Sequence, residues 1–360
     1  MFSFVLRKLG YGLLVIFGVV SLVFFLFNIL PGDPARMMLG QRADKESVDR
    51  IHKELGLDRP VSTQYFNYLN DISPLSFYST SQSSYFYFDK QKYTSAVTLL
   101  NVGTTKIVLK KPYLRQSYQS KRNVSEMLSE ALPNTIILAL ASILFAFVVG
   151  VILGSISSIY INTWVDRLIQ VITSIGMSLP SFFAAIIIAW FFAFKLSDWT
   201  HLSMFGSLKV VDDMGEGEHI CLKNLILPAL TLGIRPLAVI TELTKSTMHD
   251  VFQQDYIRTA KAKGLSTFQV IYHHALKNTL NPVITAVSGW FASLVAGAVF
   301  VEYIFDWKGM GVVIVNSLET YDFPVIMASL LVVCIFLVLI NIVTDIIYGY
   351  LDPQVKQKQS

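Results

Sequence analysis

The sequence contains little charge, since only 15% of its 360 residues are Asp, Glu, Lys or Arg, whereas a typical soluble domain has about 25%. The deficit is concentrated in long runs without a charged residue, which cover residues 9–32, 131–165, 168–194, 278–301 and 323–344. Each run exceeds the roughly 20 apolar residues that cross a bilayer. The composition therefore predicts a membrane protein with several spans and excludes an ordinary soluble enzyme or a disordered chain.

Residues that carry chemistry are also scarce. The two cysteines, Cys221 and Cys334, do not suggest a disulfide framework. All six histidines lie outside the charge-free runs, so a Ser–His pair or a histidine metal site within a span is not expected. The Gly-x-x-x-x-Gly-Lys-[Ser/Thr] motif is missing, which indicates that any ATP is bound by another subunit. We expect no catalytic residue, metal or cofactor on this chain, and the net charge of +4 gives no indication of nucleic-acid binding.

A sixth apolar segment, Asn224 to about Lys245, is interrupted by Arg235 and Glu242. Six spans place both termini on the same side of the membrane. The short connections on that side contain ten Lys or Arg residues, against four on the other side. The 14 basic residues of the long segment 33–130 are left out, because long connections translocate regardless of charge. The positive-inside rule then predicts that both termini are cytoplasmic.

The expected fold is an all-α integral membrane protein with a large external loop between spans 1 and 2. In that loop, Asp44 to Leu69 has helical periodicity. Two β-type runs at 96–100 and 106–110 flank Asn101-Val102-Gly103, and they form either a hairpin or an irregular connection. The predicted parts are the N-terminus with span 1 (1–32), the external loop (33–130), a five-span core (131–351) with a cytoplasmic loop at about 246–280, and a tail (352–360).

The cytoplasmic loop is longer than a turn requires. It is predicted to form a helix from Asp250 to Lys263, to stop at Gly264, and to start again at a capping box of Ser266 and Gln269. The residues allow two interpretations. The helices either dock on a moving partner, or lie at the membrane surface with basic residues against anionic lipid.

Arg235 and Glu242 lie seven residues apart, which places them on one helix face. Ionisable groups at that depth are costly unless they face water or a partner. They therefore either line a translocation path or serve a structural purpose, by pairing with neighbouring helices or, for Glu242, by reaching the cytoplasmic surface. Pro180, Pro228 and Pro282 are expected to bend the helices near span ends.

The chain resembles the permease subunit of binding-protein-dependent ABC importers, in particular the first of the two dipeptide/oligopeptide permease proteins. That family has a Glu-Ala-Ala-x-x-x-Gly loop, and residues 258–264 follow its pattern with Ala260 and Gly264 matching. Further motifs in the same order extend the resemblance over most of the chain, at residues 30–34, 55–60, 132–135, 255–260 and 351–353. Residues from about 77 to 115 look like an insertion.

The resemblance implies a type I ABC importer permease fold with six transmembrane helices. It also implies two further groups of site residues, in an ATPase-coupling loop and in an outer gate. These are candidates in addition to Arg235 and Glu242, the candidates for the translocation path. The coupling residues are Asp255, Tyr256, Arg258, Thr259, Ala260, Lys261, Gly264 and Leu276, and the outer-gate residues are Glu302, Gly309 and Gly311.

The implied partners are a second homologous permease, ABC ATPase subunits that bind ATP and magnesium, an external substrate-binding protein and membrane lipid. The implied location is the bacterial inner membrane. The expected substrates are di- or oligopeptides, with nickel or another small solute as the alternative. An ion-coupled secondary transporter is the main rival, although duplicated halves typical of that class are not found. A membrane enzyme is the second rival, disfavoured by the missing catalytic groups.

Overall fold

The computed structural model describes residues 2–29, 33–39, 44–81, 84–88, 93, 96–211 and 217–351. Part of the motif at residues 30–34, part of the insertion, most of the motif at 351–353 and the tail 352–360 lie outside the described residues. The chain divides into two compact units. One contains residues 1–9, 131–312 and 335–360, and the other contains residues 10–130 and 313–334.

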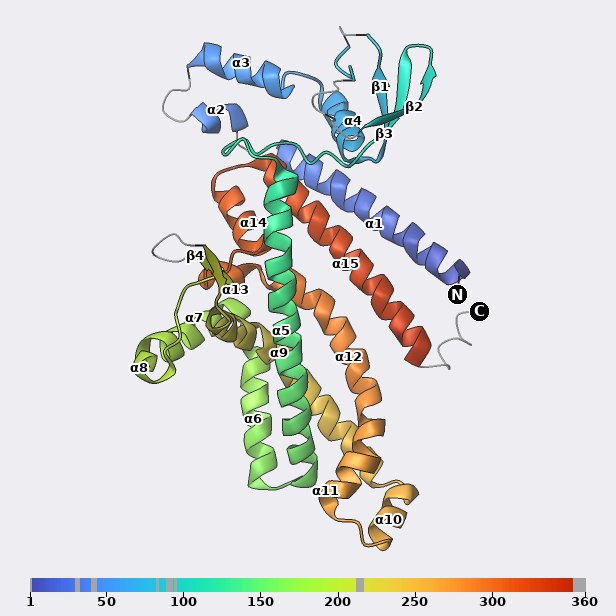
Figure 1. Ribbon diagram of the computed structural model, residues 1–360, viewed down its shortest axis with the longest axis vertical. Helices are drawn as coiled ribbons and strands as arrows, with labels where there is room; N and C mark the ends of the chain where they lie inside the picture. The colour runs from blue at the N-terminus through green and yellow to red at the C-terminus, as the bar shows by residue number, and fades with distance from the viewer. Residues whose placement is uncertain are drawn as a thin grey trace. The chain divides into compact units, whose positions relative to one another are not determined.

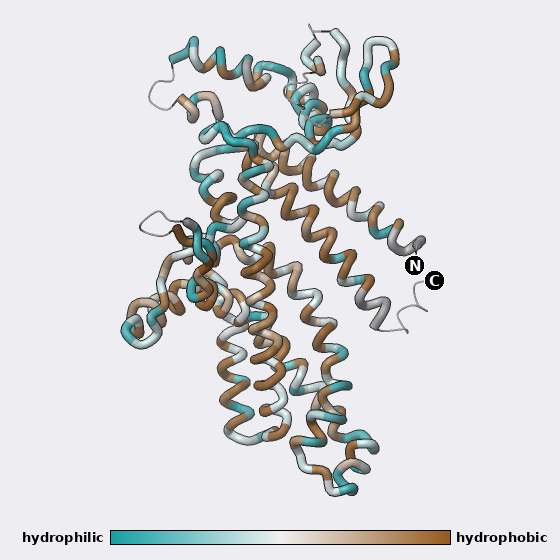
Figure 2. The backbone as a smooth tube through the Cα atoms, in the orientation of Figure 1, coloured by the Kyte–Doolittle hydropathy of each residue, from teal (hydrophilic) through white to brown (hydrophobic). Residues whose placement is uncertain are grey.

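Five helical stretches of the described chain are long and apolar enough to cross a membrane (Figure 1). They are α1 (Phe2–Ile29), α5 (Val124–Ile159), α9 (Lys223–Phe252), the stretch around α12 (Leu276–Gly297) and α15 (Phe323–Leu351). Figure 2 shows the apolar residues in brown along α5, α12 and α15. The prediction of several spans is confirmed in these helices.

The third predicted span, 168–194, is not one straight helix. It consists of α6 (Trp164–Ser178) and α7 (Ser181–Ile188), continued by the π-helical η2 (Ala189–Lys195), with a bend of 114° between the two halves. Leu179 is extended, with φ −75° and ψ 132°, because Pro180 disfavours the helical conformation in the residue before it. Six spans are obtained only if this bent pair is one span.

Small residues bring helices close together within the first unit. A side chain at Gly150 of α5 would clash with Ile240 of α9, and one at Gly176 of α6 would clash with Ile234. Such positions let two helix backbones approach where lipid provides no hydrophobic driving force.

Elsewhere in this unit, Lys8 and Asp345 form an ion pair of 2.7 Å between α1 and α15.

Short elements complete the first unit. They are α8 (Ser197–Thr200), the antiparallel pair β4 (Lys209–Val211) and β5 (Glu218–Ile220), α10 (Asp255–Ala262), α11 (Thr267–Val270), the π-helical η3 (Ile271–Ala275) and α13 (Val299–Ile304). The helix α14 (Met310–Glu319) and the helix α15 contribute residues to both units.

The segment between α1 and α5, residues 33–123, is named here the α1–α5 segment. It begins with α2 (Pro34–Leu39), α3 (Lys45–Leu55) and α4 (Val61–Ile72). The helical character predicted for Asp44 to Leu69 is confirmed, but in two helices, because Gly56 ends α3 in the left-handed conformation at φ 69° and Pro60 precedes α4.

A small antiparallel sheet follows, in which β3 (Thr105–Leu109) lies between β1 (Leu75–Ser79) and β2 (Val97–Val102). The β2–β3 pair confirms the hairpin alternative, with Val102 opposite Thr105 and Gly103 at φ 58° in the turn. The fold is therefore helical in its membrane-type part, with this sheet added in the α1–α5 segment.

Candidate functional site

The candidate site is the connection between α9 and α12, residues 253–275, named here the α9–α12 connector. Helix α9 continues past the predicted helix start at Asp250, because Met248 and Val251 are buried on its packed face. The chain then becomes extended at Gln254 (φ −73°, ψ 148°), and α10 begins at Asp255. The predicted boundary is therefore wrong by five residues, and α10 is a separate short helix.

The inner face of α10 packs against the rest of the connector. Ile257 has no exposed surface and Ala260 is 5% exposed. They belong to one apolar cluster with Val251, Val270 and Ala275. Ala260, which matches the family loop, thus lies inside the connector, and its small side chain lets α10 pack tightly.

Local signals set the turn that joins α10 to α11. Gly264 has φ 84°, the left-handed region, and no atom lies within 4 Å of the position of a side-chain Cβ. Glycine is therefore favoured at this position because of the backbone conformation, and not because space for a side chain is lacking. The capping box is confirmed, since the Ser266 hydroxyl accepts a hydrogen bond from the Gln269 amide at 3.4 Å and the Ser266 amide donates to Gln269 Oε1 at 3.0 Å. The end of α10 and the start of α11 therefore follow the prediction, within one residue.

The outer face of α10 presents most of the predicted coupling residues. Asp255, Tyr256, Arg258, Thr259 and Lys261 are all exposed. The Tyr256 hydroxyl accepts a hydrogen bond of 2.7 Å from Nδ2 of Asn278 on α12. Lys261 Nζ lies 5.6 Å from the ring centre of Phe252 at the end of α9. Through these contacts α10 is linked to both neighbouring long helices. Leu276, the remaining predicted residue, starts α12 and is half-buried.

Two exposed aromatic residues on the connector were not predicted as site residues. Phe268 is 74% exposed and Tyr272 is 62% exposed, and their rings stack at 6.2 Å with an interplanar angle of 6°. Large exposed aromatic side chains are enriched in protein interfaces. Their spacing of four residues on a predicted helix was the signal that could have identified them.

Arg235 and Glu242 are both exposed on α9, which confirms that they share a face. Neither side chain forms a hydrogen bond or ion pair with any residue that the structure describes. Three residues further along α9, Lys245 differs from them, because it forms a buried ion pair with Asp166. The open face of α9 is therefore available to water, lipid or another subunit.

The structure brings the three predicted outer-gate residues together. Glu302 on α13 has no exposed surface, and its Oε2 accepts a hydrogen bond of 2.6 Å from the Gly311 amide. A side chain at Gly309 would clash with the Glu302 carboxylate, and a side chain at Gly311 would lie 2.5 Å from the Cα of Val299. The two glycines thus make room for a buried carboxylate between α13 and α14.

Two family sequence models match this chain. The model described as "Binding-protein-dependent transport system inner membrane component" matches residues 146–357. The model described as "Binding-prot-dependent transport system membrane comp, N-term" matches residues 1–86. The first match contains the whole α9–α12 connector.

Full-length relatives are similar to this chain. The probable D,D-dipeptide transport system permease protein of Escherichia coli K12 is 33% identical over 366 residues, covering 98% of this chain and 97% of that protein. The dipeptide transport system permease protein of Alkalihalophilus pseudofirmus is 32% identical over 372 residues, covering 99% and 100%. The glutathione transport system permease protein of E. coli K12 is 30% identical over 359 residues, covering 99% and 100%.

A solved structure shares the fold. The inward-facing MetNI methionine ABC transporter gives a TM-score of 0.51 at 16% identity, covering 63% of this chain and 97% of that chain. The predicted ABC importer permease fold is confirmed over that part. The sequence models and the full-length relatives together show that this chain belongs to the family of inner-membrane components of binding-protein-dependent transport systems.

Proposed function

We propose that this chain is the permease subunit of an ATP-driven, binding-protein-dependent importer of di- or oligopeptides. The observation that carries the proposal is that the α9–α12 connector exposes polar and aromatic residues while its inner face is packed. Family membership supports the same conclusion. The relatives named as dipeptide or glutathione transport permeases are 30–33% identical over nearly the whole chain, which supports short peptides as substrates.

The connector is proposed to dock on an ABC ATPase subunit, which would bind ATP and magnesium. This chain itself would bind no cofactor. An ATPase can drive transport only through contacts that differ between two states of the permease. Asn278 and Phe252, which contact α10, would transmit its displacement into α12 and α9. The exposed residues Tyr256, Phe268 and Tyr272 are the proposed contact residues.

A second, homologous permease subunit is proposed to complete the translocation path. Arg235 and Glu242 lie exposed on α9 without a described partner, which fits a position between two subunits. The cluster of Glu302, Gly309 and Gly311 is proposed to form part of the outer gate. The chain would lie in the bacterial inner membrane in contact with lipid, with both termini in the cytoplasm. A binding protein would deliver substrate to the opposite side.

Uptake into proteoliposomes tests this proposal. The complete complex should import a labelled dipeptide only when ATP and the binding protein are both present. An ion gradient alone should drive no uptake. Uptake that follows an ion gradient and needs no nucleotide would instead assign the chain to secondary transport.

A further inference from the structure

The α1–α5 segment contains a pocket of about 300 Å³. Tyrosine and phenylalanine side chains form much of its wall, together with the ionisable residues Asp71, Arg115 and Lys121. Small-molecule sites are concave, contain a few fixed polar groups that orient the ligand, and start at about this volume. The pocket lies entirely within one compact unit and is separate from the connector and the outer-gate cluster.

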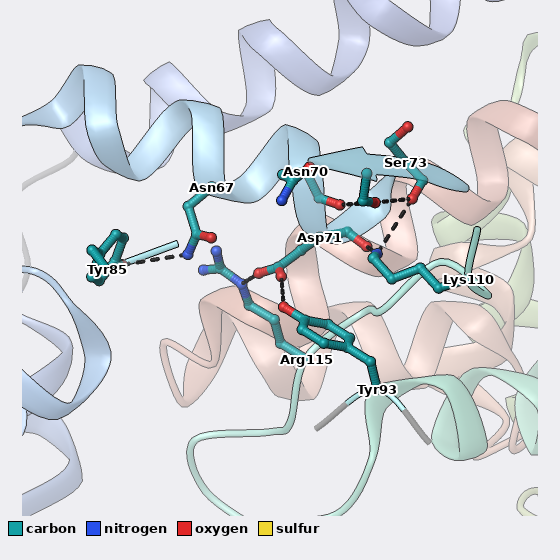
Figure 3. A network of polar contacts seen from close by, with 9 residues as sticks. Asn67, Asn70, Asp71, Ser73, Tyr85, Tyr93, Lys110 and Arg115 are labelled. Carbon is teal, nitrogen blue, oxygen red and sulfur yellow. Dashed lines mark hydrogen bonds and ion pairs between the residues drawn. The ribbon is translucent and has the colours of Figure 1, made fainter. Parts of the chain in front are cut away.

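Asp71 holds Arg115 in a fixed position at the pocket (Figure 3). The Asp71 side chain has no exposed surface, and its Oδ2 accepts a hydrogen bond of 3.0 Å from Arg115 Nε. The other carboxylate oxygen accepts a hydrogen bond of 2.6 Å from the Tyr93 hydroxyl. The Arg115 guanidinium also lies over the Tyr68 ring, 5.5 Å from its centre. The arginine is thus oriented before any ligand binds.

The outer end of this guanidinium is unoccupied within the described chain. Only Nε donates to a described residue, whereas the two terminal nitrogens have no described partner. Figure 3 shows them turned away from the Asp71 carboxylate, on the side where Asn67 lies. The backbone of Arg115 has φ 64°, a left-handed conformation that non-glycine residues rarely adopt and that often occurs at functional sites.

The charge of the pocket suits an anion. Burial has the largest single effect and would lower the pKa of Arg115, but the Asp71 carboxylate together with Tyr118 and Tyr68 raises the pKa above its ordinary value, so the guanidinium stays charged. Among the described lining residues Arg115 and Lys121 are basic and Asp71 is acidic, and behind the wall the Asp322 carboxylate accepts hydrogen bonds from Ser117 and Tyr118. A planar guanidinium with two free nitrogens matches the two oxygens of a carboxylate.

We propose that this pocket binds the terminal carboxylate of a short peptide, with Arg115 as the carboxylate-binding residue and the tyrosines as the surface for the peptide side chains. A volume of about 300 Å³ accepts the end of a small ligand but not a protein surface. Aromatic walls tolerate side chains of different shape. The choice of a peptide as the carboxylate ligand rests on the proposed function.

The test compares a free-acid dipeptide with its amide. The full-length chain is placed in lipid nanodiscs without binding protein or ATP, and the binding of alanyl-phenylalanine and alanyl-phenylalanine amide is measured by calorimetry. The free acid should bind at least about 10-fold more tightly, because the amide cannot form the charge-assisted pair. Equal binding of the two peptides, or no binding of the free acid, would overturn the proposal.

Three variants separate recognition from folding. Arg115→Gln should abolish the difference between acid and amide, whereas Arg122→Gln, which changes an exposed arginine paired with Glu130 in the same unit, should preserve it. Tyr85→Ala leaves the pair of Arg115 and Asp71 in place and should weaken both peptides equally. A difference that survives in Arg115→Gln would place the peptide elsewhere and contradict the assignment.

The outcome is independent of transport. If the free acid fails to bind while the complete complex imports the same dipeptide, the pocket assignment is wrong and the proposed function stands. If binding is as described but no dipeptide is imported, the proposed function is wrong and the carboxylate site stands.

Discussion

Nζ of Lys245 lies 2.7 Å from Oδ1 of Asp166, and both side chains are largely buried. The same carboxylate accepts hydrogen bonds from the Ser157 hydroxyl at 2.5 Å and the Asn162 amide at 3.0 Å. Lys245 is on α9, shortly before the connector, whereas Asp166 lies in the first turn of α6. This ion pair therefore fixes α9 against the α5–α6 turn, so that the connector extends from a rigid base.

Breaking this ion pair should destabilise the protein. Lys245→Met leaves the Asp166 charge buried without its counter-ion, and such a change costs about 3–5 kcal/mol. Adding Asp166→Asn should recover much of that loss, because the remaining buried charge is removed. Thermal unfolding in detergent measures both effects. If the stability losses of the two single variants simply add in the double variant, the two residues do not interact.

The effect of a substitution at Gly264 should depend on how readily the new residue adopts the left-handed backbone conformation, and not on the size of its side chain. The position is open but left-handed, and this conformation costs most L-residues about 1–2 kcal/mol, with asparagine less affected. Gly264→Asn should therefore retain most ATP-driven uptake, whereas Gly264→Val should lose several-fold. Equal uptake by the two variants would mean that the turn conformation is unimportant for coupling.

The outer-gate cluster predicts a specific rescue. A methyl group at Gly309 would meet the Glu302 side chain, so Gly309→Ala should destabilise by about 1–3 kcal/mol through overpacking. Combining it with Glu302→Ala should relieve the clash. A methyl group at Gly311 would also meet Glu302, but its closest contacts are with the Val299 backbone, which Glu302→Ala leaves in place, so Gly311→Ala should not be rescued. Unfolding temperatures of the three single and two double variants decide this, and rescue of both glycine variants would contradict the contacts described.

Alkaline pH should destabilise the α1–α5 segment through buried tyrosines. Burial raises the pKa of Tyr68 to about 12 and that of Tyr78 to about 12, whereas an unfolded tyrosine titrates near 10. A raised pKa favours the folded state only while the phenol is protonated. The stabilisation is therefore complete below about pH 10 and is lost as the pH approaches about 12.

Ultraviolet absorbance of tyrosinate, recorded together with circular dichroism during a pH titration, measures this loss. The double variant Tyr68→Phe with Tyr78→Phe should keep its folded signal to higher pH than the wild type, because phenylalanine does not ionise. Identical alkaline transitions in the two proteins would show that other groups control the transition.

Local signals in the sequence were sufficient for part of the candidate site. Gly264 and the Ser266–Gln269 capping box predicted the turn, because each acts within a few residues. The start of α10 was missed, since burial of Met248 and Val251 extends α9 beyond Asp250. The inward position of Ala260 also depends on tertiary packing, which periodicity alone does not reveal.

The larger differences have the same origin. The charge-free run 168–194 satisfied the length of a span, but the conformation of the residue before Pro180 bends it by 114°. The contact of Asp71 with Arg115 joins residues 44 apart in sequence, in a region with no recognised motif. Composition predicted where the membrane-type helices lie, whereas burial and long-range contacts determined the geometry of the sites.

Photo-crosslinking from the connector tests the central claim most directly. A photoreactive amino acid replaces Tyr272 on the connector or, as a control, Trp199, which is 88% exposed on α8 of the same unit. In the complete importer, the Tyr272 position should crosslink to the ATPase subunit with a yield that changes on ATP binding, and the Trp199 position should not. Crosslinks from Tyr272 to lipid alone, while ATP-driven uptake continues, would contradict the claim that this connector couples the permease to its ATPase.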